Sequence, residues 1–173
     1  NIWVASMEDW ESRGGLTVFT PDGSRVFNST NGLMARHILC MTEDRERNIL
    51  IADRDAGFFI YKGDHFTSFP APEYLPSNDV FTLAQDHTGK YWFGTGKGLS
   101  LYNPAMKEDA RIKLSGFPQA LEGTPINIIC PDTEGHVWIA TAGDEVYRYD
   151  INEKNFRYDL DLNASLRSLR IAA

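Results

Sequence analysis

The sequence predicts an all-β fold, a β-propeller built of four-stranded antiparallel blades, of which the chain holds four repeat-lengths. Two observations lead to this prediction. A short motif, Trp or Leu followed by a second apolar residue and then by Ala or Gly, recurs with first residues 47, 42 and 46 positions apart, which is the spacing of one blade. Strand-like runs of residues also lie at similar distances before and after each copy of this motif. The motif copies are residues 3–6, 50–53, 92–95 and 138–141.

The first two strands of a blade are expected to form a hairpin. Alternating apolar runs at 38–41, 80–84 and 126–130 lead into tight turns, and a motif strand follows each turn. An aspartate opens every turn, because its carboxylate can accept hydrogen bonds from the backbone amides ahead of it. Glycine, or Asn48 in the second copy, is expected to take the left-handed conformation that closes the turn. We therefore predict structural rather than catalytic roles for Asp44, Asp86 and Asp132.

The third and fourth strands follow each motif. Residues 15–19, 57–61, 98–102 and, more loosely, 146–149 alternate with a period of two, as a half-buried strand requires. After another turn, a short fourth strand is expected around Val26, 66–69, 112–114 and 156–158. Four strands per repeat make a propeller blade.

The chain is expected to be a single propeller fragment, residues 1–173, with repeats at about 1–36, 37–79, 80–125 and 126–165 and the start of a further repeat at 166–173. It opens in the middle of a strand without an initiator Met, and residues 166–171 resemble a first strand. We therefore expect a fragment of a longer protein. An open arc exposes the apolar faces of its end blades, so either the last strand completes the first blade or neighbouring blades are missing.

The third copy carries the most regular motif. Residues 86–102 read Asp-x-x-Gly-x-x-Trp-Phe-Gly-Thr followed by Gly-Leu-x-x-Tyr, which resembles the two-component regulator propeller repeat. The resemblance implies a seven-bladed propeller in the periplasmic sensor region of a hybrid histidine kinase of Bacteroidetes, an inner-membrane protein that responds to glycan fragments. The second copy departs from the pattern, with Asn48, Leu50 and Asp53 for Gly, Trp and Thr, and the first copy has an insertion at 7–13.

Composition excludes several partners. The net charge is −7 and the 17 Lys and Arg residues are scattered, so nucleic acid is not expected to bind. No apolar run reaches the roughly 18 to 20 residues of a membrane helix, so no membrane contact is expected. Cys40 and Cys130 lie in apolar runs and are expected to be buried free thiols, with a disulfide or redox role as the alternative. Neither a metal site nor a cofactor is expected.

Propeller enzymes need site residues that this chain does not supply in the required pattern. A sialidase Asp box has Asp two residues before Gly, whereas here they are three apart. A quinoprotein pattern is mimicked around Asp86 and Trp92 with shorter spacing, but that enzyme needs a far longer chain and a metal. A propeller lyase needs a His and Glu constellation around the channel, and the chain's histidines are predicted to be at the surface. The histidines are His37, His65, His87 and His136.

Ligand recognition is expected in the loops that join the second strand to the third and the fourth strand to the next first strand, since these emerge on one face. Their aromatic, basic and acidic residues suit an oligosaccharide or a protein partner. The candidate ligand residues are Trp10, Arg13, Arg54, Asp55, Tyr74, Lys97 and Phe117. Alternatively, Trp10, Tyr74 and Phe117 pack over the blade tops. The repeated position of the tryptophans that open the motif predicts an inter-blade core for Trp3, Trp92 and Trp138.

The leading interpretation is a sensor propeller that recognises a glycan, with no catalysis in this chain. The alternatives are a protein-interaction propeller without a small ligand and, third, a propeller lyase or other hydrolytic enzyme. The expected partners are an oligosaccharide, neighbouring blades or another domain of the same protein, and a second copy in a homodimer.

Overall fold

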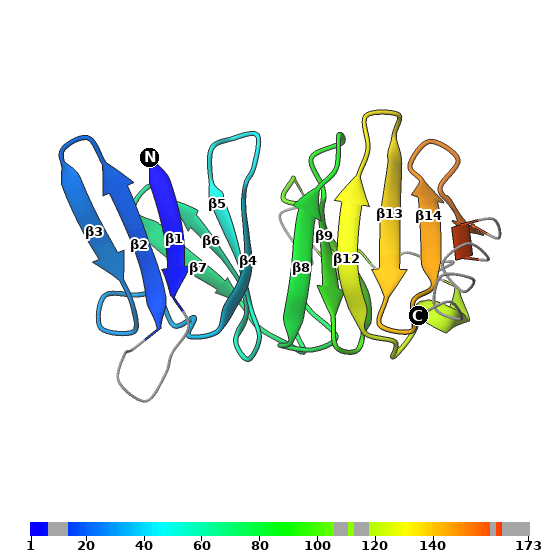
Figure 1. Cartoon of the computed structure of the whole chain (residues 1–173), viewed down its shortest axis with the longest axis horizontal. Helices are drawn as coiled ribbons and strands as arrows, with labels where there is room; N and C mark the ends of the chain where they lie inside the picture. The colour runs from blue at the N-terminus through cyan, green and yellow to red at the C-terminus, as the bar shows by residue number, and fades with distance from the viewer. Residues whose placement is uncertain (7–13, 106–110, 113–117, 160–161, 164–173) are drawn as a thin grey trace, which may run out of the picture. The chain divides into compact units, whose positions relative to one another are not determined.

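The computed structural model describes residues 1–6, 14–105, 111–112, 118–159 and 162–163, and in this part the chain forms four antiparallel sheets (Figure 1). The chain divides into two compact units, Asn1–Phe81 and Thr82–Ala173. Each unit holds two sheets, apart from the first two residues of β8, which belong to the first unit. The all-β prediction is confirmed, and within the described residues the predicted strands are found in the predicted order.

The first unit contains a three-stranded sheet in the order β1-β2-β3 and a four-stranded sheet in the order β4-β5-β6-β7. The three-stranded sheet begins with a second strand of the repeat, as the sequence predicts. The strands are β1 (Ile2–Ser6), β2 (Gly15–Thr20), β3 (Gly23–Phe27), β4 (Ile38–Glu43), β5 (Ile49–Asp53), β6 (Gly57–Lys62) and β7 (His65–Phe69).

Apolar side chains fill the space between the two sheets of the first unit. Leu16 and Phe27 from one sheet pack in the same buried cluster as Ile51 from the other. The half-buried Trp3 ring lies 5.2 Å from the ring of Tyr61, so this tryptophan joins the two sheets as predicted. Period-two alternation places these residues on the faces that meet.

The second unit holds sheets in the orders β11-β10-β9-β8 and β12-β13-β14-β15. The strands are β8 (Val80–Gln85), β9 (Tyr91–Thr95), β10 (Gly98–Tyr102), β11 (Arg111–Ile112), β12 (Ile126–Pro131), β13 (His136–Thr141), β14 (Val146–Asp150) and β15 (Asn155–Tyr158), with a short 3₁₀ helix at Gln119–Leu121.

Trp92 is fully buried between the sheets of the second unit, 5.1 Å from the ring of Tyr149, which confirms its predicted place in the core. A Cβ atom on Gly94 would lie 2.6 Å from the carbonyl oxygen of Ile126, so only glycine lets β9 approach β12 this closely. Trp138 is half-buried, with the Arg148 guanidinium 5.5 Å from its ring centre.

The aspartates that open the hairpin turns are structural, as predicted. Asp86 Oδ1 accepts hydrogen bonds from the backbone amides of Thr88 (2.8 Å) and Lys90 (3.2 Å). Asp132 Oδ1 accepts them in the same way from Glu134 (2.9 Å) and His136 (2.8 Å). These carboxylates fix the turns by satisfying backbone donors that no strand partner can reach.

The second copy of the turn differs from its prediction at one position. The left-handed residue is Arg47 (φ 68°), not Asn48, because the position three residues after the aspartate closes the turn, as Gly89 (φ 86°) and Gly135 (φ 95°) do in the other copies. Asn48 has a different role, in which its backbone amide donates to Asp44 Oδ1 (2.8 Å).

Each turn aspartate also accepts a side-chain hydrogen bond. Trp92 Nε1 donates to Asp86 Oδ2 (2.7 Å), and Trp138 Nε1 donates to Asp132 Oδ2 (3.0 Å). The second copy has Leu50 in place of tryptophan, and there Asn48 Nδ2 donates to Asp44 Oδ2 (2.7 Å) instead. Two departures from the repeat therefore compensate each other, since Asn48 supplies the donor that Leu50 lacks.

The cysteine prediction is only partly right. Both thiols are free, but Cys130 is exposed and Cys40 is half-buried. The apolar runs around them are interrupted by irregularities in pairing between Ile38 and Cys40 and between Ile126 and Ile128. These shifts change which residues of the strand face the core. Residues 166–171, expected to resemble a further first strand, lie outside the described residues.

Candidate functional site

The predicted ligand residues that the structure describes fall in three places. Arg54 and Asp55 lie in the turn between β5 and β6, Tyr74 lies in the loop between β7 and β8, and Lys97 lies in the β9–β10 turn of the second unit. Trp10, Arg13 and Phe117 lie outside the described residues. Of the four predicted ligand residues in the described ranges, only Arg54 and Asp55 lie next to each other.

Tyr74 and Lys97 have different surroundings. Tyr74 is half-buried and its ring packs edge-on against Phe69, with 5.1 Å between the ring centres, in the way the packing alternative expects. Lys97 is exposed, and its backbone amide donates to Thr95 Oγ1 (3.2 Å). Their predicted contact with a ligand stays a prediction.

A buried carboxylate, Asp53, holds the loops around Arg54 and Asp55. Asp53 is 1% exposed, and its Oδ2 accepts hydrogen bonds from the backbone amides of Arg36 (2.9 Å) and His37 (2.7 Å). Its Oδ1 accepts bonds from the amides of Asp55 (2.9 Å) and Ala56 (2.9 Å). One side chain therefore joins the loop before β4 to the turn after β5, and charge-assisted bonds of this kind are strong.

Sequence reasoning noted Asp53 only as a departure from threonine and missed this role. Thr95 and Thr141, which stand at the same place in the third and fourth copies, bond within their own turns. A hydroxyl is too short and has too few lone pairs to reach two loops, whereas a carboxylate can accept four bonds. The sequence therefore did contain a signal of this role, because Asp53 is the one acidic residue at this position among the four copies of the motif.

The residues fixed by Asp53 form an exposed polar surface, and we call Arg36, His37, Arg54 and Asp55 the Asp53 loop cluster. The Nδ1 atom of His37 and the Asp55 carboxylate form a hydrogen bond and an ion pair when the imidazole is protonated. The amide of Arg54 donates to the His37 carbonyl (3.0 Å). Arg36, Arg54 and Asp55 are exposed, so two guanidinium groups, a carboxylate and an imidazole are accessible in one place.

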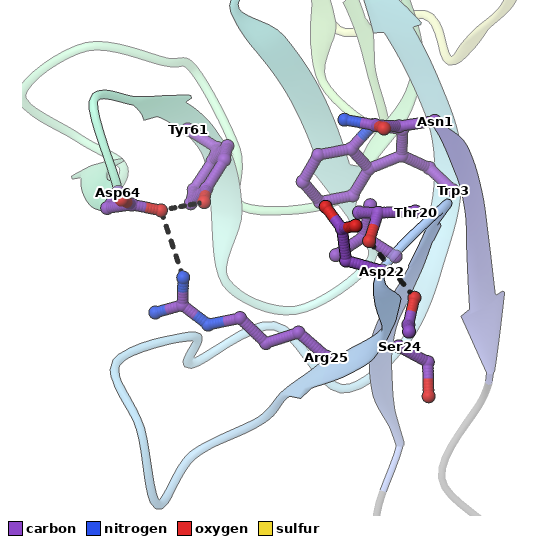
Figure 2. Close-up of a pocket in the computed structure, with 10 residues that line it drawn as sticks. Asn1, Trp3, Thr20, Asp22, Ser24, Arg25, Tyr61 and Asp64 are labelled. Atoms are coloured by element: carbon purple, nitrogen blue, oxygen red, sulfur yellow. Dashed lines mark hydrogen bonds and ion pairs between the residues drawn. The ribbon is translucent and has the colours of Figure 1, made fainter.

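A pocket of about 380 Å³ lies at the opposite end of β6, between the two sheets of the first unit (Figure 2). Figure 2 shows the Trp3 ring on one side and Tyr61, Asp64 and Arg25 on another. Tyr61 Oη donates to Asp64 Oδ1 (2.6 Å), and Arg25 Nη1 donates to the same oxygen (2.9 Å). Asp22 lies in the β2–β3 turn near Trp3. The pocket therefore combines an aromatic surface with charged groups.

The charges in the pocket are set by these bonds. Burial raises the pKa of the Tyr61 phenol, and the hydrogen bond to Asp64 raises it further. The bonds donated by Tyr61 and then by Arg25 lower the pKa of the Asp64 carboxyl. At neutral pH the pocket thus holds a neutral phenol and an ionised Asp64 carboxylate that is already paired. None of these residues was a predicted ligand residue, because the predicted ligand loops lie at the other end of the blades.

The histidines form no catalytic constellation in the part of the chain that the structure describes. His65 and His87 are exposed, as predicted, while His136 Nδ1 lies 3.0 Å from Asp132 Oδ2 in a half-buried turn. In the described residues no three metal-ligating side chains gather at one point. No helix of that part is long and apolar enough to cross a membrane.

Solved structures resemble the chain at low sequence identity. The extracellular domains of two hybrid two component systems from B. thetaiotaomicron match with TM-scores of 0.65 and 0.72 and identities of 16% and 18%, covering 90% and 93% of this chain. YCF48 from Cyanidioschyzon merolae matches with a TM-score of 0.58 and 17% identity over 88% of this chain and 55% of its own. These matches show the propeller fold. The chain spans only 24% and 22% of the two B. thetaiotaomicron domains.

Sequence comparison is more specific. No curated protein sequence matches the chain significantly. The profile described as two component regulator propeller matches residues 74–97 and 120–143. These segments contain the motif strands that begin at Trp92 and Trp138, and the first of them belongs to the copy at 86–102 on which the resemblance was based. These two segments of the chain are therefore similar to the two component regulator propeller repeat.

Proposed function

We propose that the chain is part of the extracytoplasmic sensor region of a two-component signalling protein and that it binds a glycan fragment. The observation that carries the proposal is the match of two segments to the two component regulator propeller family. The similar B. thetaiotaomicron domains, described as extracellular, support the location. We further propose that the repeats at 1–36, 37–79, 80–125 and 126–165 belong to one propeller with more blades than this chain holds.

The Asp53 loop cluster is the proposed contact surface for the glycan. Sugar hydroxyls accept hydrogen bonds from guanidinium groups and donate to carboxylates, and Arg54 and Asp55 offer both side by side. Because Asp53 fixes the backbone of this surface, little ordering entropy is lost on binding. We propose recognition rather than catalysis, since the repeated aspartates are occupied by turn amides.

Calorimetric titration of the chain with a panel of neutral and acidic oligosaccharides tests this proposal. Combining Arg54→Ala with Asp55→Ala should weaken binding by about tenfold or more, as the loss of one or two charge-assisted hydrogen bonds predicts. Asp22→Ala is the matched control, because it removes an exposed carboxylate at the pocket end of the same unit. Equal affinity in the double variant, or loss only in the control, would contradict the proposed surface.

A protein partner is the second candidate for the same surface. Met34 is 57% exposed and Leu39 is 41% exposed, and they flank Arg36 and His37 in sequence. Apolar side chains beside arginine are typical of binding hot spots in protein interfaces. If this candidate is right, the oligosaccharide panel should give no binding, while Met34→Asp should abolish capture of the chain by the other domains of its parent protein.

A further inference from the structure

The loop between β3 and β4 begins with a compact turn that asparagine side chains hold together. The backbone amides of Asn31 (3.1 Å) and Leu33 (3.0 Å) donate to the Asn28 carbonyl oxygen. Asn28 Oδ1 accepts hydrogen bonds from the amide (2.9 Å) and the hydroxyl (2.6 Å) of Thr30. Asparagine is common in such turns because its short side chain reaches backbone groups nearby in the sequence.

The side chain of Asn31 closes this turn onto β3. Its Oδ1 accepts a hydrogen bond from the Asn28 backbone amide (2.7 Å), and its Nδ2 donates to the carbonyl oxygen of Val26 in β3 (2.7 Å). Asn31 is exposed, but both halves of its amide group are used. One side chain therefore supplies a donor and an acceptor to backbone groups at the end of the strand.

The residue after Asn31 makes this position chemically labile. Asn31 is the only asparagine of the chain that is followed by glycine. Gly32 has φ +104°, and no atom lies within 4 Å of the place where a Cβ would be. Because glycine has no Cβ, its backbone nitrogen is unhindered when it attacks the preceding asparagine side chain. Asparagine followed by glycine therefore deamidates more readily than asparagine followed by any other residue.

We propose that Asn31 is a deamidation site and that its two side-chain hydrogen bonds protect it while the chain is folded. In the reaction, the Gly32 nitrogen forms a bond to Asn31 Cγ, and the bond between Cγ and Nδ2 breaks. Nδ2 leaves as ammonia with the proton that the Gly32 amide gives up, and a cyclic imide remains. A water molecule from the solvent then opens the imide and leaves aspartate or isoaspartate.

The folded turn opposes the first step of this reaction. Both hydrogen bonds of the Asn31 side chain reach back to residues 26 and 28, whereas the attacking nitrogen belongs to the following residue. The side chain must therefore leave both partners before Cγ can be attacked. One hydrogen bond of this kind slows a reaction that has to break it by about two- to tenfold, so two bonds predict a delay of about tenfold or more.

The product does not fit the turn. An aspartate at position 31 has no N–H to donate, so the bond to Val26 is lost and a charged oxygen would face the carbonyl oxygen of that residue. Isoaspartate also lengthens the backbone by one carbon atom. Leu33 and Ala35 are 0% and 1% exposed and anchor the rest of the loop, so we expect the turn to open only within residues 26–33.

Peptide mapping of the unmodified chain tests the proposal. Trypsin cleaves after Arg25 and Arg36, so one peptide carries both Asn28 and Asn31. Folded chain and chain unfolded in urea are incubated at the same mildly alkaline pH, and tandem mass spectrometry follows the mass gain of deamidation. We expect the first gain at Asn31, about tenfold or more slower in the folded sample. Equal rates in the two samples, or a first gain at another asparagine, would overturn the proposal.

Asn31→Asp supplies the product directly and tests its effect on the turn. This variant should lower the urea midpoint by roughly 0.5 M and speed the exchange of the Leu33 amide by about tenfold. Asn155→Asp is the matched control, because it adds the same charge at an exposed asparagine of the second unit and should leave the midpoint almost unchanged. Equal midpoints in the two variants would contradict the role given to the Asn31 side chain. The peptide map needs no variant, so it decides the proposal even if Asn31→Asp does not fold.

Discussion

Replacing Asp86 with alanine is expected to lower the free energy of unfolding by about 3–4 kcal/mol, because it removes the acceptor for one buried and several partly exposed donors. Asp86 is 1% exposed and accepts bonds from the amides of Thr88 and Lys90, from the Thr88 hydroxyl and from Trp92 Nε1. The indole donor, in a side chain that is 1% exposed, has no access to water, so leaving it unpaired costs about 1–3 kcal/mol. The turn amides lie nearer the surface and account for the remainder.

Asp86→Asn separates the two contributions. Asparagine has the same shape and keeps one acceptor for the turn amides, but its NH₂ group cannot accept the bond that Trp92 donates. Asp86→Asn should therefore lower the free energy of unfolding by about 1–3 kcal/mol. In a Trp92→Phe background, where the indole donor is absent, the loss caused by Asp86→Asn should be smaller by about 1–2 kcal/mol.

Urea denaturation followed by tryptophan fluorescence and circular dichroism measures these changes as shifts of the midpoint. Asp22→Ala is the control, because Asp22 is exposed, and it should stay within about 0.5 kcal/mol of the parent chain. If Asp86→Ala costs no more than the control, or if Asp86→Asn costs the same with and without the indole, the structural role of the aspartate turn is refuted.

Three further outcomes are expected. Asn48→Ala should lower the free energy of unfolding by about 1–2 kcal/mol, because Asn48 donates to Asp44 the hydrogen bond that tryptophan donates in the other copies. Asn155→Ala is the control and should change this free energy little, because Asn155 is exposed. Urea denaturation of both variants measures the difference. Gly98→Ala should lower the free energy of unfolding by about 1–3 kcal/mol, because φ at this position is +118° and the new Cβ atom would lie 2.8 Å from the Leu121 carbonyl oxygen. Gly63→Ala should lower it by only about 1 kcal/mol, because φ is +54° and no atom lies near the new Cβ. Burial raises the pKa of Asp132, but hydrogen bonds from its turn and from the Trp138 indole outweigh this effect and hold the pKa well below its usual range. The ionised carboxylate therefore stabilises the fold above about pH 4, and this stabilisation is lost as the pH falls further. Unfolding titrations between about pH 4 and pH 2 should therefore show a shallower acid loss for Asp132→Asn than for the parent chain, and equal slopes would contradict this.

The strands and turns were predictable because they depend on local chemistry. Period-two alternation and an Asp-to-Gly turn act within about ten residues, so sequence alone located β4 with β5, β8 with β9 and β12 with β13. The left-handed position in the second copy was misplaced, because Asn48 is a common left-handed residue and Arg47 is not; the regular spacing from Asp44 was the better guide.

The candidate site was only partly predictable because it depends on contacts between separate loops. Arg54 and Asp55 were identified by their position between two strands, but the link to Arg36 and His37 passes through the buried Asp53 carboxylate, a contact over 16 to 17 residues. The pocket at Trp3 arises where β3 and the β6–β7 turn approach each other through Arg25 and Asp64, which are 39 residues apart in sequence. No local pattern encodes such distances, although an acidic residue replacing threonine in a repeat is a signal that can be read.

The most direct test of the proposed sensor role is amide chemical-shift mapping of the chain with an oligosaccharide that binds it in the calorimetric panel. We expect the largest shifts on the amides that Asp53 holds, those of Arg36, His37, Asp55 and Ala56, and we expect Asp53→Asn to reduce them. Shifts concentrated at the Trp3 indole and its pocket, or no binding by any oligosaccharide of the panel, would contradict it.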